Sequence, residues 1–296
     1  MPVSMKITPT CVPCLLNRIL FEANLSSTDK DVQTQVIRKA CSLLGSLYNP
    51  NTCSAEIATQ VHKQTYELLH DSDPYKKLKQ ESNQIATSLL PIVKKRIKDS
   101  ENPLKTAILA SIVGNSLDFG IQGASKNPKE LKQVFDQIFT EGFGYDDTSH
   151  FFSALQKSNS ILYFTDNCGE IVFDRLVCEQ IKKTYPHVLI SVVVKGEPVL
   201  SDATLADAEQ LHFDSTVDHV YTTGGFAVGV DLKDLPKKVK SLMHSSDLIV
   251  CKGMANYESL SETMFHPIVY LLRSKCQPIA SSMNVPLDAN IVKMYE

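Results

Sequence analysis

The spacing of apolar residues changes character near the middle of the chain. In the first half, apolar residues recur at intervals of three and four, a spacing that predicts amphipathic helices. Turn-rich segments containing Pro, Asn, Asp and Ser separate them. The predicted helices cover residues 14–22, 31–47, 55–69, 75–98 and 104–113. The first half is therefore expected to be helical almost throughout.

After residue 158, short β-branched runs alternate with helical segments. The predicted strands cover residues 161–164, 188–194, 217–221, 248–251 and 278–280. This alternation favours a parallel sheet covered by helices. We expect an α/β fold: a Rossmann-like three-layer α/β/α sandwich with a mostly parallel sheet, joined to an all-helical N-terminal domain. The Gly- and Asp-rich residues 141–148 indicate the boundary, so residues 1–150 and residues 151–296 are predicted to form the two domains.

Composition excludes some functions. The chain has 296 residues, 43% of them hydrophobic, enough for a sizeable core. Its net charge of −3 and dispersed basic residues argue against a nucleic-acid platform. No stretch approaches the ~20 apolar residues that span a bilayer, and the first ten residues do not resemble a signal peptide. We expect a cytoplasmic protein with no membrane partner, whose eight cysteines are reduced.

Two acidic motifs follow neighbouring predicted strands. Asp166 and Asn167 come after the first apolar run, and Asp202 comes after the second. The helical pattern between them predicts a βαβ unit, which places both loops at the same edge of the sheet. Two carboxylates and an amide oxygen form a hard, incomplete shell for a divalent metal, with room for water and substrate phosphate. Alternatively, Asp166 and Asn167 only cap the helix that follows.

Other polar residues are predicted near the same edge. Lys252 and Asn256 follow the strand at residues 248–251, where a compact cation suits a phosphoryl group; a surface lysine and a helix cap are the alternative. Asn115 and Asp118 follow the helix at residues 104–113 and can reach a crevice between the two halves. That segment also fits a simple helix ending at Gly114.

Cys11 and Cys14 form a CxxC pair whose role the sequence leaves open. They fit structural thiols, a metal site completed by distant residues such as Cys41 or Cys53, or a redox pair.

Together, these motifs resemble the metal-dependent damage-control phosphatases, once catalogued as a domain of unknown function and related to a protein once proposed to methylate acidic residues. The resemblance runs from residue 11 to about residue 280 and is strongest to the shorter branch that carries the CxxC. The motifs are Cys11-Val12-Pro13-Cys14, Gly114-Asn115-Ser116-Leu117-Asp118-Phe119, Asp166-Asn167-Cys168-Gly169-Glu170, Ser201-Asp202-Ala203-Thr204, Lys252-Gly253-Met254-Ala255-Asn256-Tyr257-Glu258 and Lys275-Cys276.

The resemblance implies a divalent cation, Mn²⁺, Co²⁺, Ni²⁺ or Mg²⁺, held by Asp166, Asn167 and Asp202. It implies hydrolysis of small phosphorylated metabolites such as sugar phosphates, with Asp166 and Asp202 as catalytic residues. Both an aspartyl-phosphate route and activated water remain open. The residues expected to bind substrate are Asn115, Asp118, Glu170, Lys252, Asn256, Tyr257 and Lys275.

Two other functions compete with this hypothesis. An S-adenosylmethionine-dependent carboxyl methyltransferase is compatible with a Rossmann-like half, but the first strand leads into Asp-Asn-Cys-Gly rather than a glycine-rich cofactor turn. A non-catalytic protein that binds a phosphorylated metabolite is the second alternative.

Overall fold

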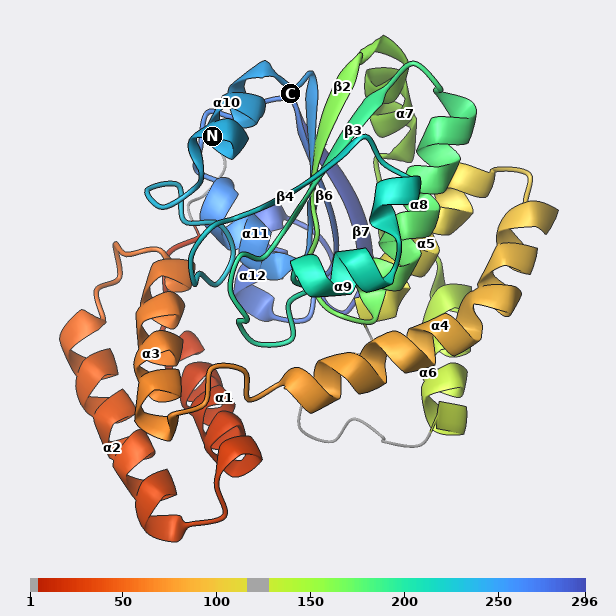
Figure 1. The fold of residues 1–296 in the computed structure, drawn as a ribbon. Coiled ribbons are helices and arrows are strands. Elements are labelled where there is room, and N and C mark those ends of the chain that lie inside the picture. The colour runs from red at the N-terminus through yellow and green to blue at the C-terminus, as the bar shows by residue number, and fades with distance from the viewer. Residues whose placement is uncertain (1–4, 116–127) are drawn as a thin grey trace.

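The computed structural model describes residues 5–115 and 128–296, and a central sheet with helices on both faces dominates it (Figure 1). None of the helices within these residues combines the length and apolarity needed to cross a bilayer. The helices are α1 Cys11–Ser26, α2 Lys30–Leu47, α3 Ser54–Leu69, α4 Lys76–Asp99, α5 Pro103–Gly114, α6 Pro128–Glu141, α7 Thr148–Lys157, α8 Glu170–Thr184, α9 Leu205–Gln210, α10 Lys237–Ser245, α11 Met254–Leu260 and α12 Gln277–Met283. The strands are β1 Tyr145–Asp146, β2 Ser160–Phe164, β3 Leu189–Val194, β4 His219–Thr222, β5 Leu248–Lys252, β6 Ile268–Arg273 and β7 Asn290–Tyr295.

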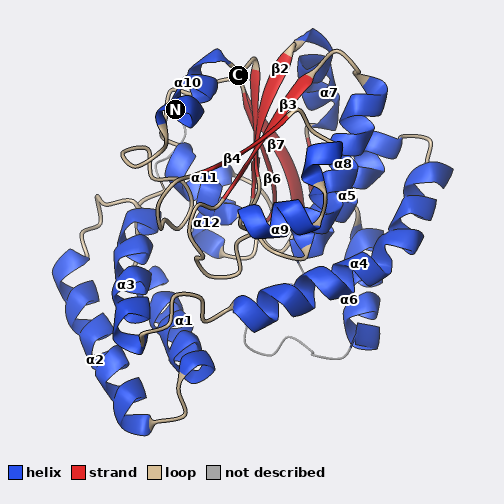
Figure 2. Cartoon of the chain, viewed as in Figure 1, coloured by secondary structure: helices blue, strands red, loops and turns tan. Residues whose placement is uncertain are grey.

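The strands form a seven-stranded sheet in the order β1-β7-β6-β5-β2-β3-β4. Figure 2 shows this sheet in red between blue helices. The adjacent strands β6, β5, β2, β3 and β4 are all parallel to one another. Strand β7 pairs antiparallel with β6 and parallel with β1. The sheet is therefore mostly parallel, with one edge reversed. This arrangement confirms the predicted α/β fold class.

Alternate residues of the central strand β2 enter two different cores. Ile161 and Tyr163 pack with α5 and α8 on one face, whereas Leu162 and Phe164 pack with α10, α11 and α12 on the other. Because both faces are covered, the strand is apolar at every one of these positions. The sheet therefore lies between two layers of helices, as the predicted three-layer sandwich requires.

The N-terminal helices divide between two cores. Helices α1, α2 and α3 enclose a small core of their own, which includes Ile19, Val36 and Ile57, and stand to one side of the sheet (Figure 1). Helices α4 and α5 instead share the large core with α8, through residues such as Ala107 and Val172. The domain division near residue 150 stays a prediction, since the helical first half does not pack as one separate body.

One predicted strand is wrong. Residues 278–280 lie in helix α12, where Pro278 occupies the first turn, a position that suits a residue with no amide hydrogen to donate. The sheet is completed by β6 and β7, on either side of that helix in the sequence. Strand β4 begins at His219, two residues later than predicted.

Candidate active site at the ends of β2, β3 and β5

The central strand β2 marks a topological switch point. From β2 the chain proceeds outward to β3 and β4, then returns to place β5 on the opposite side of β2. In open α/β sheets, the crevice outside the carboxyl ends of the strands at such a point is where ligands bind. Asp166, Asp202 and Gly253 each follow one of these strands, so the acidic motifs lie where a ligand is expected.

The two acidic loops are hydrogen bonded to each other. Asn167 and Asp202 form an isolated antiparallel bridge, and the Ala203 amide donates to the Asp166 carbonyl oxygen at 2.8 Å. The Ser201 hydroxyl donates to Asn167 Oδ1 at 2.7 Å, which fixes the direction of that amide. The structure thus brings together the three residues proposed from the sequence as oxygen donors.

Asp166 and Asp202 are both buried, at 6% and 5% exposure. Burial, followed by the charges of Asp202 and Glu170, raises the pKa of Asp166 well above its ordinary value. Its Oδ2 accepts hydrogen bonds from Asn167 Nδ2 at 2.6 Å and from Asn115 Nδ2 at 3.4 Å. These two donors to Asp166 are neutral and offset only part of the cost of a buried negative charge, so the site favours an added positive charge.

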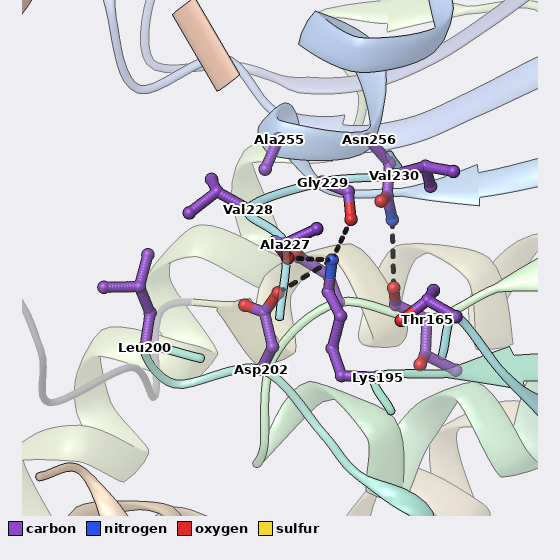
Figure 3. A network of polar contacts seen from close by, with 12 residues as sticks. Thr165, Lys195, Leu200, Asp202, Ala227, Val228, Gly229, Val230, Ala255 and Asn256 are labelled. Atoms are coloured by element: carbon purple, nitrogen blue, oxygen red, sulfur yellow. Dashed lines mark hydrogen bonds and ion pairs between the residues drawn. The ribbon is translucent and has the colours of Figure 1, made fainter. Parts of the chain in front are cut away.

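Lys195, at the end of β3, is a site residue that the sequence analysis missed. Its Nζ pairs with Asp202 Oδ2 at 3.3 Å and donates to the carbonyl oxygens of Ala227, at 3.2 Å, and Gly229 (Figure 3). Lys195 is only 2% exposed. It therefore joins the Asp202 carboxylate to the loop at residues 227–229. The sequence signal was a lysine directly after a buried strand.

Asn256 has a structural position rather than one facing the pocket. Its side-chain amide donates to the carbonyl oxygen of Thr165 at 3.0 Å (Figure 3). It also donates to the carbonyl oxygen of Lys252 at 2.8 Å. These bonds tie the end of β2 to the end of β5. Asn256 therefore holds two of the site-forming loops in register.

A pocket of about 100 Å³ opens beside the paired carboxylates. A larger pocket, about 330 Å³, lies beside α3, but none of Asp166, Asn167 and Asp202 lines it, so these residues rather than the volume identify the site. The residues lining the smaller pocket include Arg18, Asn115, Asp166, Asn167, Asp202 and Lys275. Three basic residues, one on α1, one at the end of β6 and one just after β6, thus line the pocket beside the acidic loops.

Arg18 and Arg273 are pocket residues that the sequence analysis did not single out. Arg18 lies one turn beyond Cys14 on α1, so the N-terminal helices contribute directly to the site. Arg273 ends the unpredicted strand β6 and pairs with Glu141 at 3.0 Å. The pattern of strands and helices in the sequence did not indicate that either residue would reach the site.

Lys275 and Asn115 meet at the pocket. The Lys275 ammonium donates to the Asn115 carbonyl oxygen at 2.9 Å and to its Oδ1. Asn115 is the C-cap residue of α5, directly after Gly114, the last residue of the helix. Asp118, predicted to lie beside it, falls outside the residues that the structure describes.

Three other predicted substrate residues do not line the pocket. Glu170 and Lys252 are buried beneath it and form an ion pair at 2.5 Å. Tyr257 lies in the core on the far side of β5, and its hydroxyl group lies 2.8 Å from Ser282 Oγ. Their predicted contact with substrate stays untested.

The CxxC pair occupies the first turn of α1, with free thiols at Cys11 and Cys14. Burial raises the pKa of Cys14, so this thiol is not activated as a nucleophile. Cys41 is exposed on α2, and the Cys53 thiol donates to the Glu258 carbonyl oxygen at 3.4 Å. Within residues 5–115 and 128–296, no three His, Cys, Asp or Glu side chains are arranged to hold a metal.

Comparison with known proteins agrees with this geometry. Residues 7–291 match the model of the damage-control phosphatase ARMT1-like domain. The chain is 37% identical over 292 residues to a damage-control phosphatase of Archaeoglobus fulgidus, covering 99% of this chain and 100% of the relative. It is 29% identical to a damage-control phosphatase of Pyrococcus horikoshii, covering 96% of each.

A solved structure extends the similarity to three dimensions. The crystal structure of a DUF89 family protein from Pyrococcus horikoshii superimposes with a TM-score of 0.89 and 27% identity, covering 99% of this chain and all of that one. The chain belongs to the damage-control phosphatase family with an ARMT1-like domain. It is a phosphatase, and the methyltransferase and non-catalytic alternatives are not supported by these relatives.

Proposed function

We propose that this phosphatase hydrolyses small phosphate monoesters in the pocket beside Asp166, using a divalent cation held by Asp166, Asn167 and Asp202. One observation carries the proposal: two buried carboxylates on hydrogen-bonded loops face a pocket that Arg18 and Lys275 also line. Carboxylates suit a cation, and basic side chains suit phosphate oxygens.

The residues at the site fit a divalent cation. Both carboxylates and the Asn167 amide oxygen are hard donors, of the kind that Mn²⁺ and Mg²⁺ prefer, and Co²⁺ and Ni²⁺ also accept them. The raised pKa of Asp166 reflects a burial cost that a bound cation would relieve. When bound, such a cation supplies positive charge that neutralises the phosphoryl group.

The side chains of the chain have distinct proposed roles. Lys275 and Arg18 bind phosphoryl oxygens through charge-assisted hydrogen bonds and orient the ester against Asp166. Asn115 holds the Lys275 ammonium, and Lys195 holds the Asp202 carboxylate. Asp166 either attacks phosphorus or orients water; isolation of a phosphorylated Asp166 after rapid acid quenching distinguishes the two routes.

The proposed substrates are small phosphorylated metabolites, including sugar phosphates and their damaged forms. A pocket of about 100 Å³ accommodates a phosphoryl group and few further atoms. The remainder of the metabolite then extends out of the pocket, which Arg273 also lines. The names of the Archaeoglobus and Pyrococcus relatives support this substrate class.

The test is phosphate release from a panel of sugar phosphates, nucleotides and phosphopantetheine compounds, with each of the four metals after chelator treatment. We expect metal-dependent release by the wild type and at least a 100-fold loss in Asp166→Ala, the scale seen when a group acting in the transition state is removed. Asp214→Ala, an exposed acid in the turn after α9, is the matched control and retains activity. Equal activity in Asp166→Ala and the wild type would refute the proposal.

A further inference from the structure

A group of buried charges lies beneath the pocket, between β5 and α8. Lys252, the last residue of β5, is fully buried, and its ammonium contacts Glu170 Oε1 at 2.5 Å and Asp174 Oδ1 at 2.9 Å. Both acids belong to α8, one turn apart, and both are buried. Burial opposes the Lys252 charge, but Asp174 and Glu170 outweigh it and raise the pKa of Lys252. One ammonium thus lies between two buried acidic side chains.

Asp174 is the innermost member of this group. Its Oδ1 also accepts hydrogen bonds from Ser111 Oγ at 2.5 Å and Tyr163 OH at 2.9 Å. Its Oδ2 has no hydrogen-bond partner among the residues that the structure describes. Replacing buried ionic groups by well-packed apolar residues is often neutral or stabilising. Stability of the fold therefore does not explain why a carboxylate occupies this position.

The outer member of the group reaches the pocket through Asn115. Glu170 Oε2 accepts a hydrogen bond from Asn115 Nδ2, and Asn115 Oδ1 accepts one from Lys275 Nζ. The amide therefore has an acceptor on one side and a donor on the other. A reversed amide would direct its NH₂ group at an ammonium and its oxygen at a carboxylate. Glu170 thus determines which way Asn115 faces and where the Lys275 ammonium lies.

We propose that Asp174 and Lys252 are positioning residues for the phosphatase reaction, acting through Glu170 and Asn115 on Lys275. This inference rests on the proposed function, in which Lys275 binds the phosphoryl group. Lys252 holds Glu170 Oε1, which leaves Oε2 directed at Asn115. Asp174 fixes the other side of Lys252, so the ammonium does not shift toward Glu170 alone. Neither positioning residue lines the pocket or touches substrate.

A double-mutant cycle tests this chain of contacts. Asp174→Asn keeps an acceptor for Ser111 and Tyr163 but removes the charge opposite Lys252. We expect it to weaken binding of inorganic phosphate, measured by calorimetry with Mn²⁺ present, by about tenfold, the lower end of the ~10–100-fold cost of disturbing groups that orient a site. The Michaelis constant should rise by a similar factor, with a smaller change in kcat.

The decisive comparison is with Lys275→Met. If Asp174 acts through Lys275, adding Asp174→Asn to Lys275→Met causes no further loss of phosphate affinity, within about twofold. If the double variant instead loses affinity by the product of the two single-variant factors, the inference is overturned. Wild-type phosphate affinity in Asp174→Asn would also overturn it. If Asp174→Asn does not fold, Glu170→Gln replaces it in the same cycle with the same criteria.

Tyr163→Phe is the control for a purely structural effect. It removes another hydrogen bond to Asp174 Oδ1 without changing any charge or the contact with Lys252. We expect a lower melting temperature and phosphate affinity within twofold of the wild type. An affinity loss equal to that of Asp174→Asn would mean that packing, not charge, is responsible, and would overturn the inference. Absence of turnover in the wild type would instead refute the proposed function, so the two failures are distinct.

Discussion

Gly253 and Asp166 are so close that no side chain fits between them. A Cβ atom built on Gly253 would lie 1.9 Å from Asp166 Oδ2, and the glycine has φ +77°, a conformation that other residues rarely adopt. The backbone after β5 therefore packs directly against the carboxylate proposed to hold the cation. This contact fixes the position of Asp166 at the switch point of the sheet.

Gly253→Ala should displace the Asp166 carboxylate. We expect kcat/KM to fall at least 100-fold and Mn²⁺ affinity to fall with it, because metal sites tolerate little displacement of a ligand. Steady-state phosphate release and calorimetry provide the measurements. Gly45→Ala, an exposed position in α2 where an added Cβ meets nothing within 4 Å, is the matched control and should leave both quantities unchanged. Normal activity in Gly253→Ala would contradict the account.

The raised pKa of Asp166 predicts that the ionised carboxylate, which the proposed metal site needs, destabilises the metal-free protein. Its pKa is raised by burial, by Asp202 and by Glu170, so folding takes up a proton at pH values where the unfolded chain has already lost it. The stability of the metal-free protein should therefore fall as pH rises from about 4, the unfolded value, through the raised folded pKa.

Asp166→Asn removes this effect while abolishing activity. In the presence of chelator at pH 7, we expect its melting temperature to exceed that of the wild type by about 2–4 °C, the shift typical of roughly 1 kcal/mol. The difference should shrink below pH 4. Melting curves across pH, with Asp214→Asn as control, provide the measurement. A lower melting temperature for Asp166→Asn at pH 7 would show that the buried charge is not a cost.

Lys195 should support Asp202 most strongly when no cation is bound. Lys195→Met leaves the Asp202 carboxylate buried beside Asp166 without the ammonium, so we expect a loss of about 3–5 kcal/mol in chelator. Saturating Mn²⁺ should recover part of it, since the cation supplies the missing charge. Urea unfolding with and without Mn²⁺ measures both values.

The control for this variant is Lys182→Met. Lys182 pairs with Asp218 at 2.5 Å, but both side chains are about a quarter exposed. An exposed pair contributes ~0–1 kcal/mol. We expect a small loss that Mn²⁺ does not change. If Lys195→Met behaves like Lys182→Met, then Lys195 has no special relation to the acidic site.

Arg18 should affect substrate binding although it belongs to the N-terminal helices. Its side chain lines the pocket, so Arg18→Met should raise the Michaelis constant about tenfold, because a hydrogen bond to a charged group contributes ~1.5–3 kcal/mol. Mn²⁺ affinity should not change. Arg38→Met, on the exposed face of α2, should match the wild type in both assays. An unaltered Michaelis constant in Arg18→Met would remove α1 from the site.

The sequence predicted the centre of the fold well because its signals are local. The apolar run of β2, the amphipathic pattern of α8 and the apolar run of β3 each lie within a few residues, and the βαβ rule then brings Asp166 and Asp202 to one edge. Prediction failed near the C-terminus, where residues 278–280, predicted as a strand, lie in helix α12 with Pro278 in its first turn. Periodicity alone does not distinguish a short apolar helix from a short strand.

The remaining site residues depend on contacts between distant segments. Lys195 follows a buried strand, but two of its partners are carbonyl groups more than thirty positions away, at Ala227 and Gly229. Asp174 lies in the middle of α8, between Phe173 and Arg175, and its link to Lys252 requires the packing of α8 on β5. Glu170 and Lys252 were found from their motifs, but the sequence could not show that they lie beneath the pocket.

Calorimetric titration of Mn²⁺ into the chelator-treated protein tests the central claim most directly. We expect the wild type and Asp214→Asn to bind one ion per chain with the same affinity. Asp202→Asn should bind at least 100-fold more weakly, because it loses one of two charged donors. Wild-type Mn²⁺ affinity in Asp202→Asn would show that the cation lies elsewhere and would contradict the proposed site.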